Sequence, residues 1–143
     1  MAITAVLANH FKYQLANKKI DLAADSIKVL LMASGYTFNK DTHSAFANVS
    51  ATELATGHGY TRNSKVLASC VLTEDSGADR AEMVCDDVAW TASSAIGPTP
   101  GAILYDDAAS AADAVIGYLD FDGNQTAPDT EAFEIKNIKI RVS

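Results

Sequence analysis

The apolar residues of this chain come mostly in short runs, and two of the clearest lie in its C-terminal half. Residues 101–106 and 114–121 are each apolar up to an acidic residue, Asp106 and Asp120. Runs of this length, separated by a polar, Ala-rich link, are typical of neighbouring strands in a buried sheet. Residues 27–33 form another such run, which predicts a central strand.

The N-terminal segment has a different spacing of apolar residues. Leu7, Phe11 and Leu15 lie four residues apart, which predicts one amphipathic helix over residues 4–17. The alternation of Phe11, Tyr13 and Leu15 is the competing pattern, that of a strand. We favour the helix because Ile3 and Val6 lie close to the same stripe.

The middle of the chain predicts further strands. Residues 66–72 and 80–85 are expected to be strands joined by an acidic, Gly-bearing turn at 73–79. Residues 88–90 form one more short apolar strand. In residues 80–85, apolar positions alternate with polar ones, as in a strand with one buried face: Ala81, Met83 and Cys85.

Two segments are expected to be irregular. Residues 35–61 are polar and turn-rich, and within them Ser50 and Glu53 have the spacing of a capping box, which predicts a single helical turn. That turn ends at the Gly-His-Gly sequence of residues 57–59. Residues 96–101 hold two prolines, which lack the N–H that a strand ladder uses, so we expect a loop there.

The last apolar segment, residues 133–142, changes its pattern part-way. Its apolar positions are odd-numbered before residues 136–137 and even-numbered after them. This switch predicts a bulge, or a strand that passes between two sheets. With several short strands and one helix, the chain is expected to be mainly β, a β-sandwich or jelly-roll-like barrel with one N-terminal helix. No repeat or break in composition divides it, so residues 1–143 are expected to form a single domain.

Composition and charge narrow the function classes. The chain has 143 residues, of which 48% are hydrophobic and 20% charged, an ordinary globular balance. Its net charge of −7 argues against a nucleic-acid binder, because neutralising phosphates requires clustered Lys and Arg. The nearest basic cluster, Lys136, Lys139 and Arg141, is too small to hold a duplex. No nucleic-acid partner is expected.

Cys70 and Cys85 are the two cysteines, and their spacing matches no metal motif. Both lie in apolar, strand-like segments, so we interpret them as buried free thiols, with a cross-strand disulfide as the alternative. The N-terminus lacks the pattern of a secretory signal, and no apolar stretch approaches the length of a membrane span. The sequence therefore predicts a protein made in the cytoplasm without export and without a membrane partner.

The histidines and one acidic segment were the first candidates for a metal site. His10, His43 and His58 lie far apart in sequence and in different expected elements, so no metal site is expected from them. Residues 120–124 are rich in Asp, but their glycine comes too early for an EF-hand loop. We interpret them as a turn after a strand.

Two adjacent acidic pairs, at residues 86–87 and 106–107, are the candidates for acid–base chemistry. Neighbours on a strand point to opposite faces, so each pair offers at most one carboxylate to a site. We interpret both pairs as charges at strand ends. The sequence contains no serine-hydrolase elbow, phosphate-binding loop or zinc-protease motif. It therefore predicts a protein that is not an enzyme and takes no cofactor.

Five short motifs follow one another in an order shared with a known family. A strand at residues 27–32 is followed by Gly-His-Gly-Tyr-Thr at 57–61 and by Val-Ala-Trp-Thr at 88–91. Gly-Ala-Ile-Leu-Tyr-Asp at 101–106 and Tyr-Leu-Asp-Phe at 118–121 come next. Over most of the chain, this order resembles that of small virion structural proteins of tailed bacteriophages.

The resemblance implies a role on the virion, as a cement or decoration protein on the exterior of the capsid. Such a protein binds the shell of the major capsid protein and stabilises it by non-covalent contacts. These proteins commonly form small homo-oligomers, so a homo-oligomer is expected, with a trimer favoured. A tail or neck component is the alternative within the same class. The family has no catalytic residues to transfer.

Assembly by surface fit requires exposed loops, so the contact surfaces are expected at residues 35–61 and 97–101, with the link at 108–114 as a further candidate. A carbohydrate- or receptor-binding module, which would present exposed aromatic residues on one face, is an alternative. A small hydrolase would need His43 or His58 beside a serine or carboxylate. The candidate interface residues are Tyr36, Phe38, Phe46, His58, Tyr60, Pro98 and Pro100.

Overall fold

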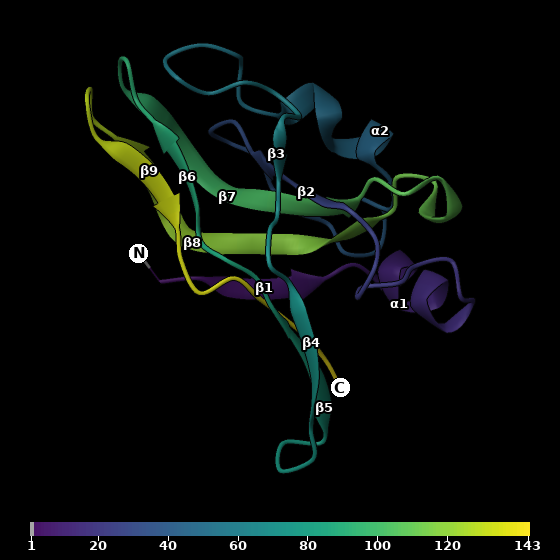
Figure 1. The fold of residues 1–143 in the computed structure, drawn as a ribbon. Helices are drawn as coiled ribbons and strands as arrows, with labels where there is room; N and C mark the ends of the chain where they lie inside the picture. Colours follow the sequence, from purple (N-terminus) through teal and green to yellow (C-terminus); the bar gives the residue numbers. More distant parts are fainter. Residues whose placement is uncertain (1) are drawn as a thin grey trace.

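The computed structural model describes residues 2–143, and over these residues the protein is mainly β, with ten strands in three antiparallel sheets (Figure 1). The largest sheet has the order β1-β8-β7-β2-β3. In that order its strands are Thr4–Leu7, Val115–Ala127, Ile96–Asp106, Ile27–Leu31 and Lys65–Val66. The prediction of a mainly β, sandwich-like fold is confirmed.

Two smaller sheets complete the fold. One has the order β10-β5-β4, with strands Lys139–Val142, Arg80–Val84 and Val71–Asp75. The other pairs β6 (Val88–Thr91) with β9 (Ala132–Ile135). The chain leaves β9 in one sheet and enters β10 in another, so the predicted passage between two sheets is confirmed.

The helical elements within residues 2–143 are short. They are α1 (Asn9–Ala16), α2 (Phe46–Val49) and the 3-10 turns η1 (Ser50–Thr52) and η2 (Ala109–Ala111). The helical turn predicted from the capping-box spacing is therefore present as η1. The box itself does not form, because the Glu53 side chain turns into the interior.

The N-terminal segment is a strand followed by a helix, so the prediction of one helix over residues 4–17 is wrong. β1 pairs with β8, with Leu7 opposite Gly117, and α1 begins only after β1 has ended. Gly117 permits this pairing, because a Cβ there would lie 2.5 Å from the carbonyl oxygen of Val6. The four-residue apolar spacing thus runs across two different elements.

Residues 96–101, expected to be a loop, are the first half of β7. The register between β7 and β8 shifts on both sides of Thr99. Pro98 and Pro100 lie at these shifts, where the missing N–H of proline leaves no ladder hydrogen bond unmade. Residues 120–124, expected to be a turn after a strand, lie inside β8 and include the bulge opposite Pro100.

Residues 66–72, expected to be one strand, belong to two. Ser69 has a left-handed backbone (φ 53°), which turns the chain between β3 and β4. Cys70, just before β4, is bonded to Cys85, just after β5, so the interpretation as free thiols is wrong and the alternative holds. The two cysteines extend the antiparallel β4–β5 ladder by one pair, which places them opposite each other.

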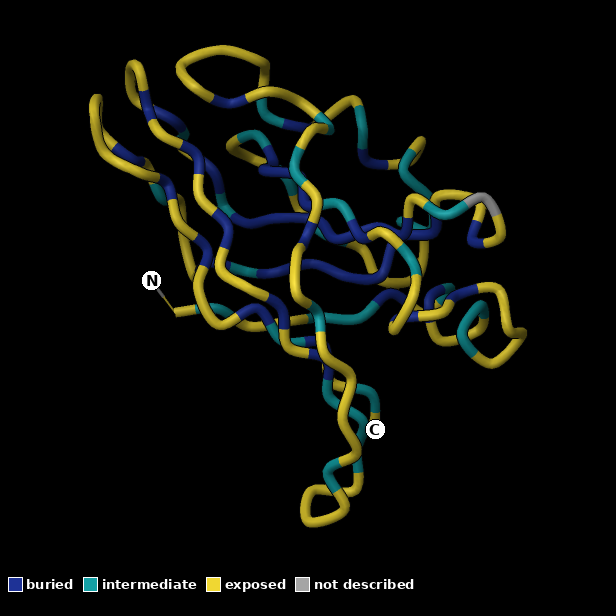
Figure 2. The backbone as a smooth tube through the Cα atoms, viewed as in Figure 1, coloured by how far each residue is buried: buried dark blue, intermediate teal, exposed yellow. Residues whose placement is uncertain are grey.

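The centre of the core is formed by β7 and β8. Residues 101–106 and 115–119 are all buried, and Figure 2 shows the middle of both strands as a continuous buried band. The ring centroids of Phe121 on β8 and Phe133 on β9 lie 5.9 Å apart, and Trp90 on β6 lies 6.4 Å from Phe133. The β6–β9 sheet therefore packs on the same core as the large sheet.

Candidate functional site

Two of the expected contact residues, Tyr36 and Phe38, belong to an aromatic cluster on the loop after β2. Both side chains are half-buried and pack on Tyr118 of β8, with ring centroids 5.6 Å and 5.5 Å away. The Tyr36 hydroxyl lies 2.9 Å from Nδ1 of His43, whose ring also stacks on Tyr36. The cluster fixes the loop to the main sheet and leaves part of two aromatic rings at the surface.

The phenols of this cluster stay neutral at physiological pH. Burial, and then the neighbouring Tyr118, raises the pKa of Tyr36 well above its usual range. Burial, and then the charge of Asp120, raises the pKa of Tyr118 to about 12. A neutral aromatic cluster of this kind suits packing against a partner better than proton transfer.

Phe46, at the start of α2, is also half-buried. Its ring stacks on that of Tyr105 of β7, with centroids 4.9 Å apart. The Tyr105 hydroxyl donates a hydrogen bond to Oδ1 of Asn63, and burial raises the pKa of Tyr105 to about 12. Phe46 therefore holds α2 on the sheet and exposes only part of its ring.

Tyr60 is buried, so its expected place at an interface is wrong. Its hydroxyl donates to Oε1 of Glu53 at 2.6 Å and accepts from the N–H of Leu31 at 3.0 Å. The N–H of Asn63 donates to the same Glu53 oxygen at 2.7 Å, and Nε of Arg62 lies 3.6 Å from the other. This buried network holds the loop of residues 53–63 against β2.

His58, Pro98 and Pro100 lie around the end of β7. His58 is exposed, has a left-handed backbone, and its Nδ1 lies 2.9 Å from the carbonyl oxygen of Ala95. Pro98 is exposed and Pro100 is half-buried. The seven expected interface residues thus do not form one surface: they divide among the aromatic cluster, α2, the interior and this end of the sheet.

The largest exposed feature was not expected from the sequence. The sheet β10-β5-β4, called the arm below, projects from the body as a narrow hairpin with the C-terminus beside it (Figures 1 and 2). Val71 is 59% exposed, Leu72 43% and Val84 37%. The two consecutive aliphatic residues Val71 and Leu72 were visible in the sequence. The alternating pattern of residues 80–85, however, suggested a half-buried pair of strands, so the exposure of the arm was not predicted.

One face of the arm carries a row of ion pairs. Arg80 lies 3.3 Å from Asp75 and 3.4 Å from Glu82, and Arg141 lies 2.7 Å from Glu82. The hydrogen bond from Arg141 is the main reason why the pKa of Glu82 is lowered. These contacts join β4, β5 and β10, so the arm has a defined shape although Val71, Leu72 and Val84 are exposed.

Asp106 departs from the interpretation of its pair as charges at a strand end, because its side chain is fully buried. Its Oδ1 accepts from the N–H of Ala108 at 2.9 Å, while Oδ2 has no protein donor among residues 2–143. Burial, and then a hydrogen bond shared with Asp25, raises the pKa of Asp106 to about 7. We interpret the raised pKa of Asp106 as a proton that it shares with Asp25 and that would satisfy the buried oxygen.

Neither a metal-binding cluster nor a membrane-spanning helix is found among residues 2–143. Among the described residues, no three His, Cys, Asp or Glu side chains converge on a position that could hold a metal ion. None of the described helices is both long and apolar enough to cross a membrane. No protein-family model, curated protein or solved structure matches the chain.

Proposed function

We propose that this chain is a structural protein of a tailed-phage virion, a cement or decoration protein on the capsid exterior. It binds the shell of the major capsid protein and stabilises it by non-covalent contacts. The observation that carries the proposal is the projecting arm with its exposed Val71, Leu72 and Val84. Aliphatic side chains gathered on a projection are typical of a surface that another protein covers.

Two further observations support an assembly role. The polar groups of the Tyr60 network bond to one another, so they stabilise loops and present no open reaction site. The disulfide at the base of the arm persists best in an oxidising environment, such as the outside of a released particle. A protein made in the host cytoplasm would close this bond after lysis.

The proposed partners are the major capsid protein and further copies of the chain, with a trimer favoured. The net charge of −7 suits docking on basic patches of a shell and opposes contact with packaged nucleic acid. The proposal assigns the protein no catalytic step and no cofactor. A tail or neck position uses the same kind of contacts and differs from this proposal only in location.

The test uses purified particles of the phage that encodes the chain. We expect mass spectrometry to detect the chain in those particles, and cryo-electron microscopy to locate it outside the capsid shell. Shells stripped of the protein should bind the full chain again and then resist heating better. Density at the tail or neck would replace the capsid position, and absence from purified particles would overturn the virion proposal.

A binding module for carbohydrate is the second candidate, and the half-exposed rings of Tyr36 and Phe38 are the observation that favours it. A carbohydrate-binding face could also have used the ring of Tyr60, but this ring is buried. A glycan array decides between the two candidates. Saturable glycan binding that is lost in a Tyr36→Ala, Phe38→Ala double variant would favour the binding module.

A further inference from the structure

Two strands at the same end of the molecule each have one edge without a partner. Among residues 2–143, β1 pairs only with β8 and β4 pairs only with β5. An unpaired edge presents a row of N–H and C=O groups to which another strand can bond. Natural proteins often protect such edges with Pro or charged residues, Lys above all; β1 has none of these, and β4 is charged only at its end, at Glu74 and Asp75.

A groove runs beside β1. A hollow of about 570 Å³ lies between β1, α1 and the end of β10, with Val6, Leu7, Leu15 and Val142 in its lining. A second hollow, of about 450 Å³, adjoins it and shares Ala5 and Leu7. We call the two hollows together the β1 groove.

The rim of the β1 groove is basic. Lys12 and Lys40 lie at the first hollow, and Lys139 and Arg141 lie at the second. Within the described part of the chain, Lys40 pairs with Asp41 and Arg141 with Glu82, whereas Lys12 and Lys139 are in no ion pair. In a chain of net charge −7, an apolar groove with two free cations is a local exception.

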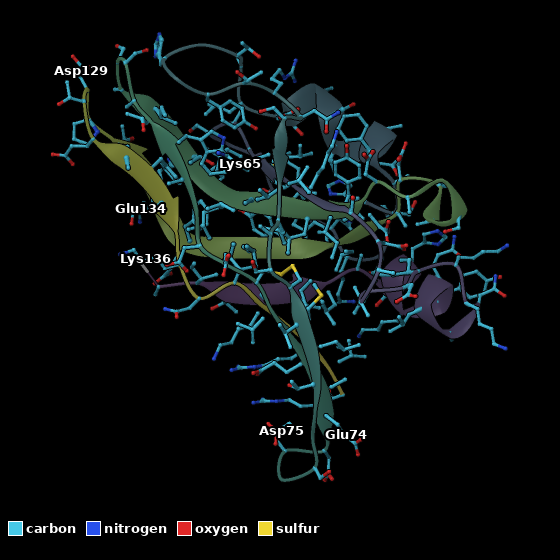
Figure 3. The ribbon with its side chains drawn as sticks, viewed as in Figure 1. Lys65, Glu74, Asp75, Asp129, Glu134 and Lys136 are labelled. Atoms are coloured by element: carbon cyan, nitrogen blue, oxygen red, sulfur yellow. A yellow bond between two sulfur atoms is a disulfide. The ribbon has the colours of Figure 1, made fainter. Side chains whose placement is uncertain are left out.

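The strand β4 has the complementary composition. Val71 and Leu72 are exposed, and Glu74 follows them on the same strand. Figure 3 places Glu74 and Asp75 at the far end of the arm, close to its turn. Asp75 pairs with Arg80, whereas Glu74 and the exposed Asp79 are in no ion pair over residues 2–143. An apolar strand that becomes acidic fits an apolar groove with a basic rim.

We propose that the arm of one copy lies in the β1 groove of a second copy of this chain. The free edge of β4 bonds to the free edge of β1, Leu72 covers the apolar lining, and Glu74, on the same face of β4 as Leu72, pairs with Lys12. This inference rests on the proposed assembly role and adds to it the partner of the arm.

The groove that receives an arm belongs to a different copy. The arm's own strand β10 supplies Val142 to one wall of the groove, and the arm extends away from the body (Figure 1). Its tip therefore points away from the groove beside its base. The contact joins two unlike surfaces, so it repeats from copy to copy, and we expect the copies to close as a ring rather than extend as a filament.

The test measures the mass of the full chain by size-exclusion chromatography with light scattering over a range of concentrations. We expect the unmodified chain to form a defined oligomer, and its mass gives the number of copies in the ring. Glu74→Lys and Lys12→Glu each place like charges together, so each should weaken association by about tenfold or more. The double variant should restore it, because every contact again joins unlike charges.

Asp129→Lys is the matched control, since this charge reversal lies at the opposite end of the molecule from Glu74 (Figure 3). It should leave the mass unchanged. Circular dichroism checks that each variant folds, and Asp79→Lys replaces Glu74→Lys if the latter does not. A monomeric unmodified chain, an oligomer insensitive to either reversal, or a double variant that stays dissociated would overturn this contact. None of these results bears on the presence of the chain in particles, which tests the virion proposal separately.

Discussion

Asp106 makes stability depend on pH near neutrality. Its pKa is raised to about 7, against about 4 in the unfolded chain, so folding takes up a proton between those values. The stability that this group contributes is complete below about pH 4 and is lost as the pH rises through about 7. Above that pH, Asp106 is ionised, and its Oδ2 is buried without a donor.

The variant Asp106→Asn tests this interpretation, because an amide donates to Asp25 and still accepts from the N–H of Ala108. At pH 8 we expect the free energy of unfolding in urea to rise by about 1–3 kcal/mol, the cost of a buried polar group without a partner. At pH 5 the difference should be small. Asp129→Asn, at an exposed loop, is the control. Equal effects of Asp106→Asn at both pH values would contradict the proton shared between the carboxyl groups.

Tyr60 was expected at an interface, but the structure buries it in a hydrogen-bond network. Removing its hydroxyl in Tyr60→Phe leaves Oε1 of Glu53 with one donor fewer and the N–H of Leu31 without its acceptor. We expect the free energy of unfolding to fall by about 1–3 kcal/mol, measured by urea denaturation. Tyr13→Phe is the matched control, because Tyr13 is 63% exposed. Equal stability of the two variants would show that the network does not stabilise the fold.

At the level of elements, the sequence predicted best where burial is continuous. The runs at 101–106 and 27–33 became the central strands β7 and β2, because a strand buried on both faces is apolar throughout. The prediction from sequence failed where pairing between strands that are distant in sequence decides the structure. Pro98 and Pro100 indicated a loop, but the bulges between β7 and β8 accommodate both prolines within a strand.

The candidate site was predictable only in part, for a similar reason. Aromatic residues in the loop at 35–61 could be singled out as candidates from the sequence, but whether a ring faces inward depends on partners distant in sequence. Tyr60 is held in the interior by its hydrogen bonds with Glu53 and Leu31, and the local sequence pattern does not predict these bonds. The arm is exposed because β4 is an edge strand with no partner on its outer side. The pattern of apolar residues does not predict whether a strand lies at an edge.

The disulfide at the base of the arm is expected to stabilise the fold. Cys70 and Cys85 are 15 residues apart, and closing a loop of that size restricts the unfolded chain. The Cys70→Ser, Cys85→Ser double variant should lose about 3 kcal/mol of unfolding free energy in urea. The arm should also become more sensitive to limited proteolysis. The unmodified chain under reducing conditions should behave like the variant, and unchanged stability in both would contradict this role.

The whole molecule joins three sheets, and aromatic contacts couple two of them. Trp90 of β6 packs near Phe133 of β9, and Phe133 packs near Phe121 of the large sheet. The arm joins the same core through Met83 and Ile140, which are both buried. Sheets that share side chains in one core lose those contacts together, which favours unfolding in a single step.

Trp90 provides a direct test of this coupling, because it is the one tryptophan of the chain. Its fluorescence reports on the β6–β9 sheet, whereas far-ultraviolet circular dichroism reports on all strands. If the three sheets form one cooperative unit, the two signals should give the same midpoint and slope in urea. Phe133→Ala should lower the midpoint of both signals equally, since it removes the ring that joins Trp90 to Phe121. A tryptophan transition that precedes the change in circular dichroism would instead show that the two-stranded sheet unfolds as a separate unit.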